Sequence, residues 1–596
     1  MHLTTLDWVI IAVSLAVTFI PAIVLARRAG KNTTEFFAAG RKAPWWLIGI
    51  SLVATTFSTD TPNLVTNLVR DGGVAENWVW WSFLLTGMAT VFFYARLWRR
   101  SGVLTDLEFY ELRYSGAAAK AVRWIRALYL GLFFNCFIIA SVNLAAVKIA
   151  SVLFGWPRTE TLLLCAVVPI VFAATAGLWG VMVTDMIQFF ITMTAAFAAA
   201  YFALHAPGVG GLHAMIAHVG LAHPHMLSML PNFGDWPTAL AIFVIPLTVQ
   251  WWSAWYPGSE PGGGSYVAQR MLAARTENDA LFGTFAFQAM HYALRPWPWI
   301  VVALASTIVY PTLGDIHARF PHVAPDLLGN DIAYPAMLVF LPAGFAGLMV
   351  AGMFAAYRST IETHLNWGTS YLVHDFYRRL IRRDASEAHY VFAGRVVTVL
   401  LMIAGVGVTY ALGTAREAFN LLISIGAGTG LIYLLRWFWS RINAWSEISA
   451  MASSFVIALT FFISGKFGHA ASSTTVLLVT VAFTTAVWLT VTWMTPRDDE
   501  QTLERFYAKV RPAGPGWAAV RRRGGLPPSP DSPAQALGAW VLGLASIYGA
   551  LFSTGAFVYG NAVAGTVWAV VSAVAIVGLV VLMKRDRSAS PQIAQD

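Results

Sequence analysis

The sequence has few charges and almost no cysteine. Only 12% of its 596 residues are charged and 57% are hydrophobic, whereas soluble domains average about 25% charged residues. This shortage excludes an ordinary soluble protein and is typical of a chain that crosses a membrane many times. The two cysteines, Cys136 and Cys165, both lie in apolar stretches, so the sequence predicts no disulfide framework.

Catalytic motifs are missing as well. The chain contains neither an HExxH zinc motif nor a Walker A phosphate-binding loop. Its longest polar stretch, residues 496–534, is too short to hold a soluble catalytic domain. We therefore expect that the protein is not an enzyme. The first apolar segment lacks a basic leader, so we interpret it as a retained helix and not as a cleaved signal peptide.

Long apolar stretches are what the sequence has in abundance. A helix needs roughly 20 apolar residues to cross a bilayer, and about fifteen segments approach that length. We therefore predict an all-α polytopic membrane protein. The expected spans, numbered 1 to 15, are 6–26, 45–69, 76–97, 120–153, 160–176, 178–205, 238–258, 279–311, 334–373, 391–412, 416–437, 444–465, 472–494, 535–558 and 561–583.

Basic residues mark one side of the predicted membrane protein. Clusters follow spans 1, 3, 9, 11 and 15, whereas residues 205–236 contain neither lysine nor arginine. Because basic loops stay in the cytoplasm, we predict a multi-pass protein of the plasma (bacterial inner) membrane with its N-terminus outside and its C-terminus cytoplasmic. The clusters are Arg27, Arg28 and Lys31; Arg96, Arg99, Arg100, Arg113, Lys120 and Arg123; Arg378, Arg379, Arg382 and Arg383; Arg436 and Arg441; and Lys584, Arg585 and Arg587.

Two predicted spans are interrupted by polar residues, proline and glycine. Span 2 contains "ATTFSTDTPNLVTN", which Pro62 breaks, and span 7 ends in "WYPGSEPGGGSYVAQR". Interruptions in corresponding positions of two halves indicate a transporter made of inverted repeats, here a 5+5 core of spans 2–11. The expected units are a first accessory span in 1–30, repeat halves in 43–258 and 259–441 with a break near 236, accessory spans 12 and 13 in 442–495, a cytoplasmic linker in 496–534, and accessory spans 14 and 15 with the tail in 535–596.

The stretch "AAYRSTIETHLNWG" places charges and hydroxyls inside span 9. Charges at membrane depth usually mark an ion or substrate pathway. Ala356, Ser359, Thr360 and Thr363 have the i, i+3, i+4, i+7 spacing of one helix face. Hydroxyls and freed carbonyls are the ligands that a small hard cation prefers. Alternatively, these hydroxyls bond to their own helix or join neighbouring helices.

Spans 2 and 6 strengthen the interpretation as a cation pathway. Where span 2 unwinds, around residues 54–61, carbonyls lose their partners within the helix and a cation could bind them. Asp185 lies a few residues into span 6, where a carboxylate needs a partner. The alternative is a helix-end acid near the membrane interface.

Six stretches follow one another in the order of a known family's motifs. They are "APWWLIGISLVATTFS" (Ala43–Ser58), "GVLTDLEFYELRYSG" (Gly102–Gly116), "TDMIQ" (Thr184–Gln188), "YVAQRMLAAR" (Tyr266–Arg275), "AAYRSTIETHLNWGTSYLVHDFY" (Ala355–Tyr377) and "RWFWSRINAWSE" (Arg436–Glu447). With them the chain resembles, from about Leu6 to Glu447, the sodium:solute symporter family. The resemblance implies the LeuT-like inverted-repeat fold.

The resemblance implies a sodium site between spans 2 and 9. Its carbonyl ligands would be those of Ala54, Phe57 and Ala356, and its hydroxyl ligands those of Ser359 and Thr360. Sodium is therefore the expected coupling ion.

Some members of the family have a second cation site, which is expected here at Asp185, Ser359, Glu362 and Thr363. Glu362 stands where the family has a hydroxyl. It could ligate sodium, carry a proton, or pair with Arg358 four residues earlier. We favour the ion pair.

The solute site is expected at the midplane between spans 2, 3, 7 and 11. By resemblance, Thr61 would contact the solute. Aromatic faces with a few polar groups suit a small polar solute, although tryptophan and tyrosine also form interfacial belts. The candidates on span 7 are Gln250, Trp251, Trp252, Trp255, Tyr256 and Glu260.

Arg295 lies midway along span 8, just before Pro296, and needs a counter-ion. The candidates are Glu260, Glu362, Asp60 and an anionic substrate. If Arg295 pairs with a carboxylate of the substrate, the solute is an organic acid or an amino acid. If Arg295 pairs with Glu260, a sugar remains a possible solute.

These observations predict a sodium-coupled symporter that imports a small polar organic solute, a sugar, sugar acid, carboxylate or amino acid. A proton-coupled symporter of the same fold and a solute sensor that does not transport are the alternatives. The expected partners are the solute and membrane lipid, with no nucleic acid and no obligate protein partner.

Overall fold

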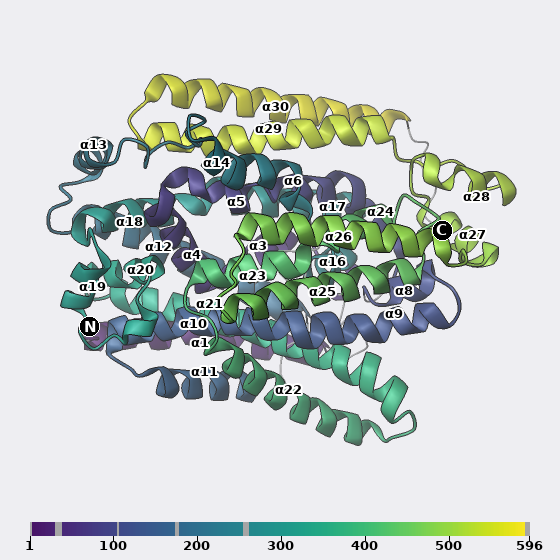
Figure 1. Cartoon of the computed structure of the whole chain (residues 1–596), viewed down its shortest axis with the longest axis horizontal. Helices are drawn as coiled ribbons and strands as arrows, with labels where there is room; N and C mark the ends of the chain where they lie inside the picture. The colour runs from purple at the N-terminus through teal and green to yellow at the C-terminus, as the bar shows by residue number, and fades with distance from the viewer. Residues whose placement is uncertain (1–2, 30–38, 104–105, 173–177, 254–260, 590–596) are drawn as a thin grey trace.

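Helices form nearly all of the regular secondary structure of the described residues (Figure 1). The computed structural model describes residues 3–29, 39–103, 106–172, 178–253 and 261–589. Within these ranges the single β-type contact is one bridge between Ala43 and Ala274. The predicted all-α class is thus confirmed.

Nine helices of the described residues are long and apolar enough to cross a membrane. The other predicted spans are interrupted, shorter or less apolar, so the count of fifteen stays a prediction. The long unbroken helices are α1 (Thr5–Ala29), α11 (Arg158–Phe172), α12 (Leu178–Leu204), α21 (Phe345–Ser370), α22 (Glu387–Thr409), α25 (Ala444–Lys466), α26 (Ser473–Met494), α29 (Pro533–Val558) and α30 (Ala562–Ala589).

Spans 3, 4, 7, 8 and 9 contain π-helical turns, which add a residue to a helical turn and often occur at functional sites. The pieces are η2 (Val74–Asn77), α5 (Trp78–Trp81), α6 (Leu84–Ala89), η3 (Thr90–Tyr94) and α7 (Ala95–Ser101) in span 3; α9 (Gly116–Leu128), η4 (Tyr129–Phe134) and α10 (Asn135–Phe154) in span 4; α17 (Glu277–Ala289), η7 (Met290–Leu294) and α18 (Pro296–Val309) in span 8; and η11 (Tyr371–Ile381) after α21 in span 9.

Four predicted spans are broken. The breaks in spans 2 and 7 agree with the sequence. Span 9 is interrupted at residues 341–344, before α21 begins, and span 11 contains a further break. The pieces are α3 (Trp45–Thr55) and α4 (Asp60–Gly72) in span 2; α14 (Trp236–Ala239), η5 (Leu240–Val244), α15 (Ile245–Thr248) and η6 (Gln250–Trp252) in span 7, followed by α16 (Ser265–Ala273); and α23 (Ala415–Ala427) and α24 (Gly430–Leu435) in span 11.

Short helices complete the described chain. They are η1 (Ala39–Arg41), α8 (Glu108–Arg113), α13 (Leu212–Ala222), α19 (Leu313–Arg319), η8 (Pro325–Leu327), η9 (Asn330–Ile332), α20 (Ala333–Met337), η10 (Leu338–Phe340), α27 (Glu500–Val510), η12 (Pro515–Trp517) and α28 (Ala518–Arg523).

The broken second span lies at the centre of the helix packing. Helix α3 contacts α12, α17 and α21, and α21 also contacts α12. Helices α29 and α30 pack together along one flank of the bundle, at the top of Figure 1, while α11 and α22 lie along the opposite flank. Spans 2, 6, 8 and 9 therefore meet around the break.

The segment predicted as a polar linker, residues 496–534, holds helices α27 and α28 and docks on one end of the bundle. The Trp517 indole N–H donates to the Trp437 carbonyl at 2.8 Å, and the Trp517 ring stacks on Phe506 at 5.1 Å. Gly516 lies so close to the bundle that an added Cβ would be 2.0 Å from the Phe438 carbonyl oxygen. We call this the linker end and the opposite end, which carries α13 and α19 (left in Figure 1), the loop end.

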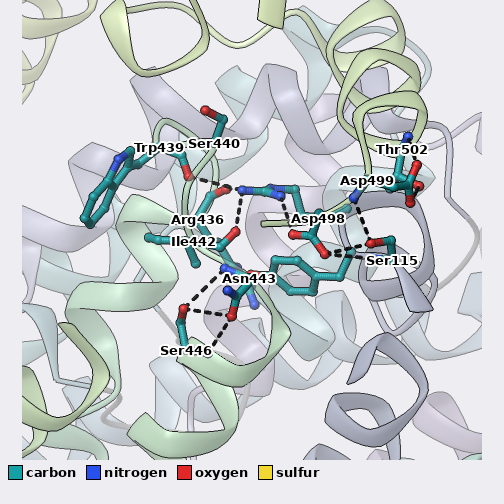
Figure 2. A network of polar contacts seen from close by, with 12 residues as sticks. Ser115, Arg436, Trp439, Ser440, Ile442, Asn443, Ser446, Asp498, Asp499 and Thr502 are labelled. Atoms are coloured by element: carbon teal, nitrogen blue, oxygen red, sulfur yellow. Dashed lines mark hydrogen bonds and ion pairs between the residues drawn. The ribbon is translucent and has the colours of Figure 1, made fainter. Parts of the chain in front are cut away.

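A buried polar network fixes the start of the linker (Figure 2). The Ser115 backbone N–H donates to Asp498 Oδ1 at 2.8 Å, and Arg113 Nη1 lies 3.6 Å from Asp498 Oδ2. Burial raises the pKa of the Asp498 carboxyl, and the Arg113 guanidinium opposes that rise. Asn443 caps α25 beside this network, because its side chain accepts the Ser446 N–H at 3.1 Å.

Candidate ion and solute site

The unwound residues 56–59 separate α3 from α4. The Thr56 N–H donates to the Leu52 carbonyl at 3.2 Å, and the Phe57 N–H donates to the Ala54 carbonyl at 2.9 Å, so the helix tightens and ends. The hydroxyls that follow compete with the backbone for hydrogen bonds. Pro62 lies in the first turn of α4, where its missing N–H has no partner to lose. The break therefore precedes Pro62 and does not fall at it.

The break faces the hydroxyl-bearing part of α21. Phe57 and Ala356 line one small cavity between the break, α12 and α21. Ala54 at the end of α3 and Thr360 on α21 are also buried, and these two helices are in contact. Thr360 Oγ1 donates to the Ala356 carbonyl at 3.0 Å. That bond uses the hydroxyl proton and leaves the lone pairs of Oγ1 able to bind a cation. The donor set therefore fits a small hard cation.

Asp185 is the centre of a second polar cluster. Ser51 Oγ donates to Asp185 Oδ2 at 2.7 Å, and Thr55 Oγ1 donates to the same atom at 3.3 Å. Ser359 Oγ donates to Asp185 Oδ1 at 3.3 Å. The carboxylate is 1% exposed. Helices α3, α12 and α21 are thus joined through one carboxylate, directly beside the break.

Arg270 completes this cluster and was not among the predicted site residues. Its Nη2 lies 3.6 Å from Asp185 Oδ2 and donates to Thr55 Oγ1 at 3.3 Å. Arg270 is 1% exposed. The signal was present as the "Q-R" at the end of α16, but the pattern of one helix does not show which acid on another helix it meets.

Glu362 lies with Arg358. The Arg358 Nη1 to Glu362 Oε1 distance is 3.3 Å, and both side chains are mostly buried. Thr363 is half-buried in the next position of α21. Of the predicted second-site residues, the structure joins Asp185 to Ser359 and joins Glu362 to Arg358.

The predicted solute residues lie near the breaks of spans 2 and 7. Thr61 is 4% exposed in the first turn of α4. Gln250 is buried, and its Nε2 donates to the Val79 carbonyl. Trp252 is half-buried, with its ring centroid 5.5 Å from that of Trp251. The predictions for Trp255, Tyr256 and Glu260 fall outside the described residues.

Arg295 contacts the break itself. Its Nη1 donates to the Val53 carbonyl at 3.1 Å and to Thr56 Oγ1 at 3.0 Å. The side chain is fully buried. Span 8 therefore delivers a guanidinium to the end of α3.

The break in span 11 lies against the break in span 7. An added Cβ on Gly430 would be 1.5 Å from the Trp252 carbonyl oxygen, so only glycine allows α24 to approach η6 this closely. The glycine-rich run "GAGTG", residues 426–430, was the available signal for this break.

Comparison with known proteins identifies the family of this chain. The profile of the Sodium:solute symporter family matches residues 36–456. A sodium/glucose cotransporter of Vibrio parahaemolyticus is 26% identical over 447 residues, which are 72% of this chain and 79% of that protein. A sodium/mannose cotransporter of Bos taurus is 25% identical over 494 residues, which are 77% of this chain and 79% of that protein.

Among solved structures, a sodium-coupled sialic acid symporter in a substrate-bound outward-open state has the same fold. The TM-score is 0.63 at 18% sequence identity, and the match covers 83% of this chain and 99% of that one. The predicted LeuT-like transporter fold is thus confirmed.

Proposed function

The chain belongs to the sodium:solute symporter family and is a sodium-coupled solute symporter, and from this premise we propose that it imports a small polar organic solute by alternating access. The observation that carries the proposal is the small cavity that Phe57 of the break and Ala356 of α21 line together, one turn before Thr360.

Sodium acts by holding two helices together. Bound to the carbonyls of Ala54, Phe57 and Ala356 and to the hydroxyls of Ser359 and Thr360, the ion joins α3 to α21. A ligand shifts a conformational equilibrium by its difference in affinity for the two states. Sodium therefore favours the state in which this contact is formed and the outer pathway is open. Solute binding then allows the core to move and release both to the cytoplasm.

The electrochemical gradient is sufficient to concentrate the solute. One charge that crosses about 100 mV releases roughly 2.3 kcal/mol, and a tenfold sodium gradient adds about 1.4 kcal/mol. Together they support an accumulation of roughly 500-fold per sodium ion.

We propose a stoichiometry of one sodium ion. Support comes from Arg270, whose guanidinium already lies 3.6 Å from Asp185, and from the pairing of Glu362 with Arg358. A fixed cation at Asp185 reduces the attraction of that carboxylate for a second mobile one.

A sugar or sugar acid is the best supported solute. The relatives named above are sodium/glucose and sodium/mannose cotransporters, and the structural neighbour is a sialic acid symporter. The Thr61 hydroxyl, the Gln250 amide and the Trp252 ring supply the polar groups and the aromatic face that such a solute needs. We assign the protein to the plasma membrane with its linker end in the cytoplasm, because the basic loops lie on that side of the predicted topology.

Uptake into proteoliposomes tests the proposal. We expect labelled monosaccharides or sugar acids to accumulate with inward sodium and not with inward potassium, with a Hill coefficient near one. Replacing both Ser359 and Thr360 with alanine should raise the half-saturating sodium concentration at least tenfold, since two ligands are lost.

The matched control is Thr460→Ala, which removes an exposed hydroxyl that bonds only to its own helix at Val456 and should leave sodium dependence unchanged. Uptake that follows a proton gradient without sodium would contradict sodium coupling. Solute binding without uptake would indicate a sensor.

A further inference from the structure

A buried arginine of span 8 holds the end of α3 from the side of α17 and α18. Arg295 Nη1 donates both to the Val53 carbonyl and to Thr56 Oγ1. His291, one turn earlier, places its Nδ1 3.4 Å from Thr56 Oγ1. The same short turn thus receives two nitrogen-bearing side chains from one helix.

The local sequence of span 8 explains this placement. The π-helical turn η7 inserts an extra residue just before Arg295, and Pro296 then starts α18. The guanidinium carbon lies 5.3 Å from the Phe57 ring centroid and 5.1 Å from the Trp299 ring centroid, so two aromatic faces hold it in place.

The end of α3 concentrates carbonyl oxygens. The Leu52 and Ala54 carbonyls accept the N–H groups of Thr56 and Phe57, and the Val53 carbonyl accepts the Thr56 hydroxyl at 2.9 Å as well as Arg295. The partial negative charge of the helix C-terminus adds to the attraction of these oxygens for cations. Arg295 binds the Val53 carbonyl, and the adjacent Ala54 carbonyl is one of those proposed to bind sodium. The break therefore offers oxygens to one fixed cation and one mobile cation.

We propose that Arg295 is a positioning residue that holds the end of α3 in its ion-binding shape and thereby sets the sodium affinity. The proposal rests on the sodium site proposed above. A tethered guanidinium keeps the break formed after sodium leaves, so that the ion does not have to organise the carbonyls each time it binds.

Sodium binding measured on the purified full chain tests this role. The readouts are the shift of melting temperature with sodium concentration and the half-saturating sodium concentration of uptake. We expect Arg295→Gln to raise the half-saturating sodium concentration roughly tenfold or more, as the loss of a charge-assisted hydrogen bond predicts, with a smaller change in maximal rate. Arg295→Lys should restore part of the affinity, and Thr56→Val should shift it in the same direction by less.

Arg436→Met is the matched control, since Arg436 is a buried arginine near the linker end. It should lower the melting temperature and leave the half-saturating sodium concentration unchanged. The inference is overturned if Arg295→Gln shows the sodium dependence of the wild type, or if it weakens only the binding of anionic solutes. A wild-type protein that sodium does not stabilise would instead contradict the proposed function itself.

Discussion

At each end of the bundle, the loop end and the linker end, one arginine bridges two acids. At the loop end, Arg416 of α23 lies 2.9 Å from Asp71 and 2.8 Å from Glu76. All three residues belong to the transport core, because Asp71 lies at the end of α4 and Glu76 in η2. We call these residues the loop-end clasp.

The linker-end clasp differs in the origin of one acid. Arg100 of α7 lies 2.9 Å from Glu277, which begins α17, and 2.9 Å from Asp531 of the linker. The loop-end clasp consists of residues of the core alone, whereas the linker-end clasp includes a carboxylate from the segment that follows the core. The linker therefore contributes an ion-pair partner to the core and is not only a connection between spans 13 and 14.

Each clasp has a buried ion pair nearby. Lys148 lies 2.7 Å from Asp331 in the region of the loop end, and Arg113 lies 3.6 Å from Asp498 at the linker end, with every side chain at most 5% exposed. A buried pair is costly to separate, whereas half-exposed pairs are worth little each. We infer that the clasps open and close while the buried pairs stay intact.

The largest effect is expected from the buried pair at the linker end. Arg113→Met leaves the Asp498 carboxylate buried without its cation, and should lower the free energy of unfolding by about 3–5 kcal/mol. The variant also loses the group that opposes the raised pKa of Asp498. A raised pKa in the folded state makes stability fall as pH rises, so the difference from the wild type should be smallest near pH 4 and grow toward neutral pH.

Chemical denaturation between pH 4 and pH 8 measures this effect. The control is Arg523→Met, because Arg523 pairs with Glu500 in the open, with side chains 47% and 65% exposed. It should cost less than about 1 kcal/mol. Equal losses of unfolding free energy in the two variants would show that the buried Arg113–Asp498 pair matters no more for stability than an exposed pair.

A smaller effect is expected from the loop-end clasp. Arg416→Gln removes two partly exposed ion pairs worth about 0.2–1 kcal/mol each, and should raise the open fraction of the loop end by roughly twofold to thirtyfold. The labelling rate of a Thr61→Cys reporter measures that fraction, in a background that carries Cys136→Ser and Cys165→Ser. A slower reaction from the loop-end side would contradict the assigned role of the clasp.

The breaks show how far the sequence predicts this fold. Polar residues near Pro62 indicated the break in span 2, because they offer the backbone other hydrogen bonds. The break in span 11 was missed, since its glycines lie in an apolar run and the reason for them, the Trp252 carbonyl, belongs to another span. The linker has a polar composition, which conceals the helical spacing of its apolar residues. Four of these residues are spaced along one face of α27 and are buried: Leu503, Phe506, Tyr507 and Val510.

The candidate site, like the fold, was predicted from the sequence only in part. The face of Ser359 and Thr360 has a helical period, so one-dimensional spacing identified it, and Asp185 stood out as a charge in an apolar helix. The partners of the charges could not be predicted, because Arg270 reaches Asp185 and Arg295 reaches Val53 from other helices. Spacing gives the face of a helix, and only packing gives what that face meets.

The smallest and most selective effect is expected from the linker's own carboxylate. In Asp531→Asn, Arg100 keeps its ion pair with Glu277. The interaction energy lost should therefore be under about 1 kcal/mol, and the fraction of molecules with an open linker end should rise at most a few-fold. The population shift caused by Asp531→Asn should oppose the shift caused by Arg416→Gln, because a weaker linker-end clasp favours opening of the linker end. The Thr61→Cys reporter should react more slowly from the loop-end side and faster from the linker-end side. Asp326→Asn, at an exposed pair with Arg158, should change neither rate. If Asp531→Asn instead speeds labelling from the loop-end side, the linker takes no part in closing its end of the core.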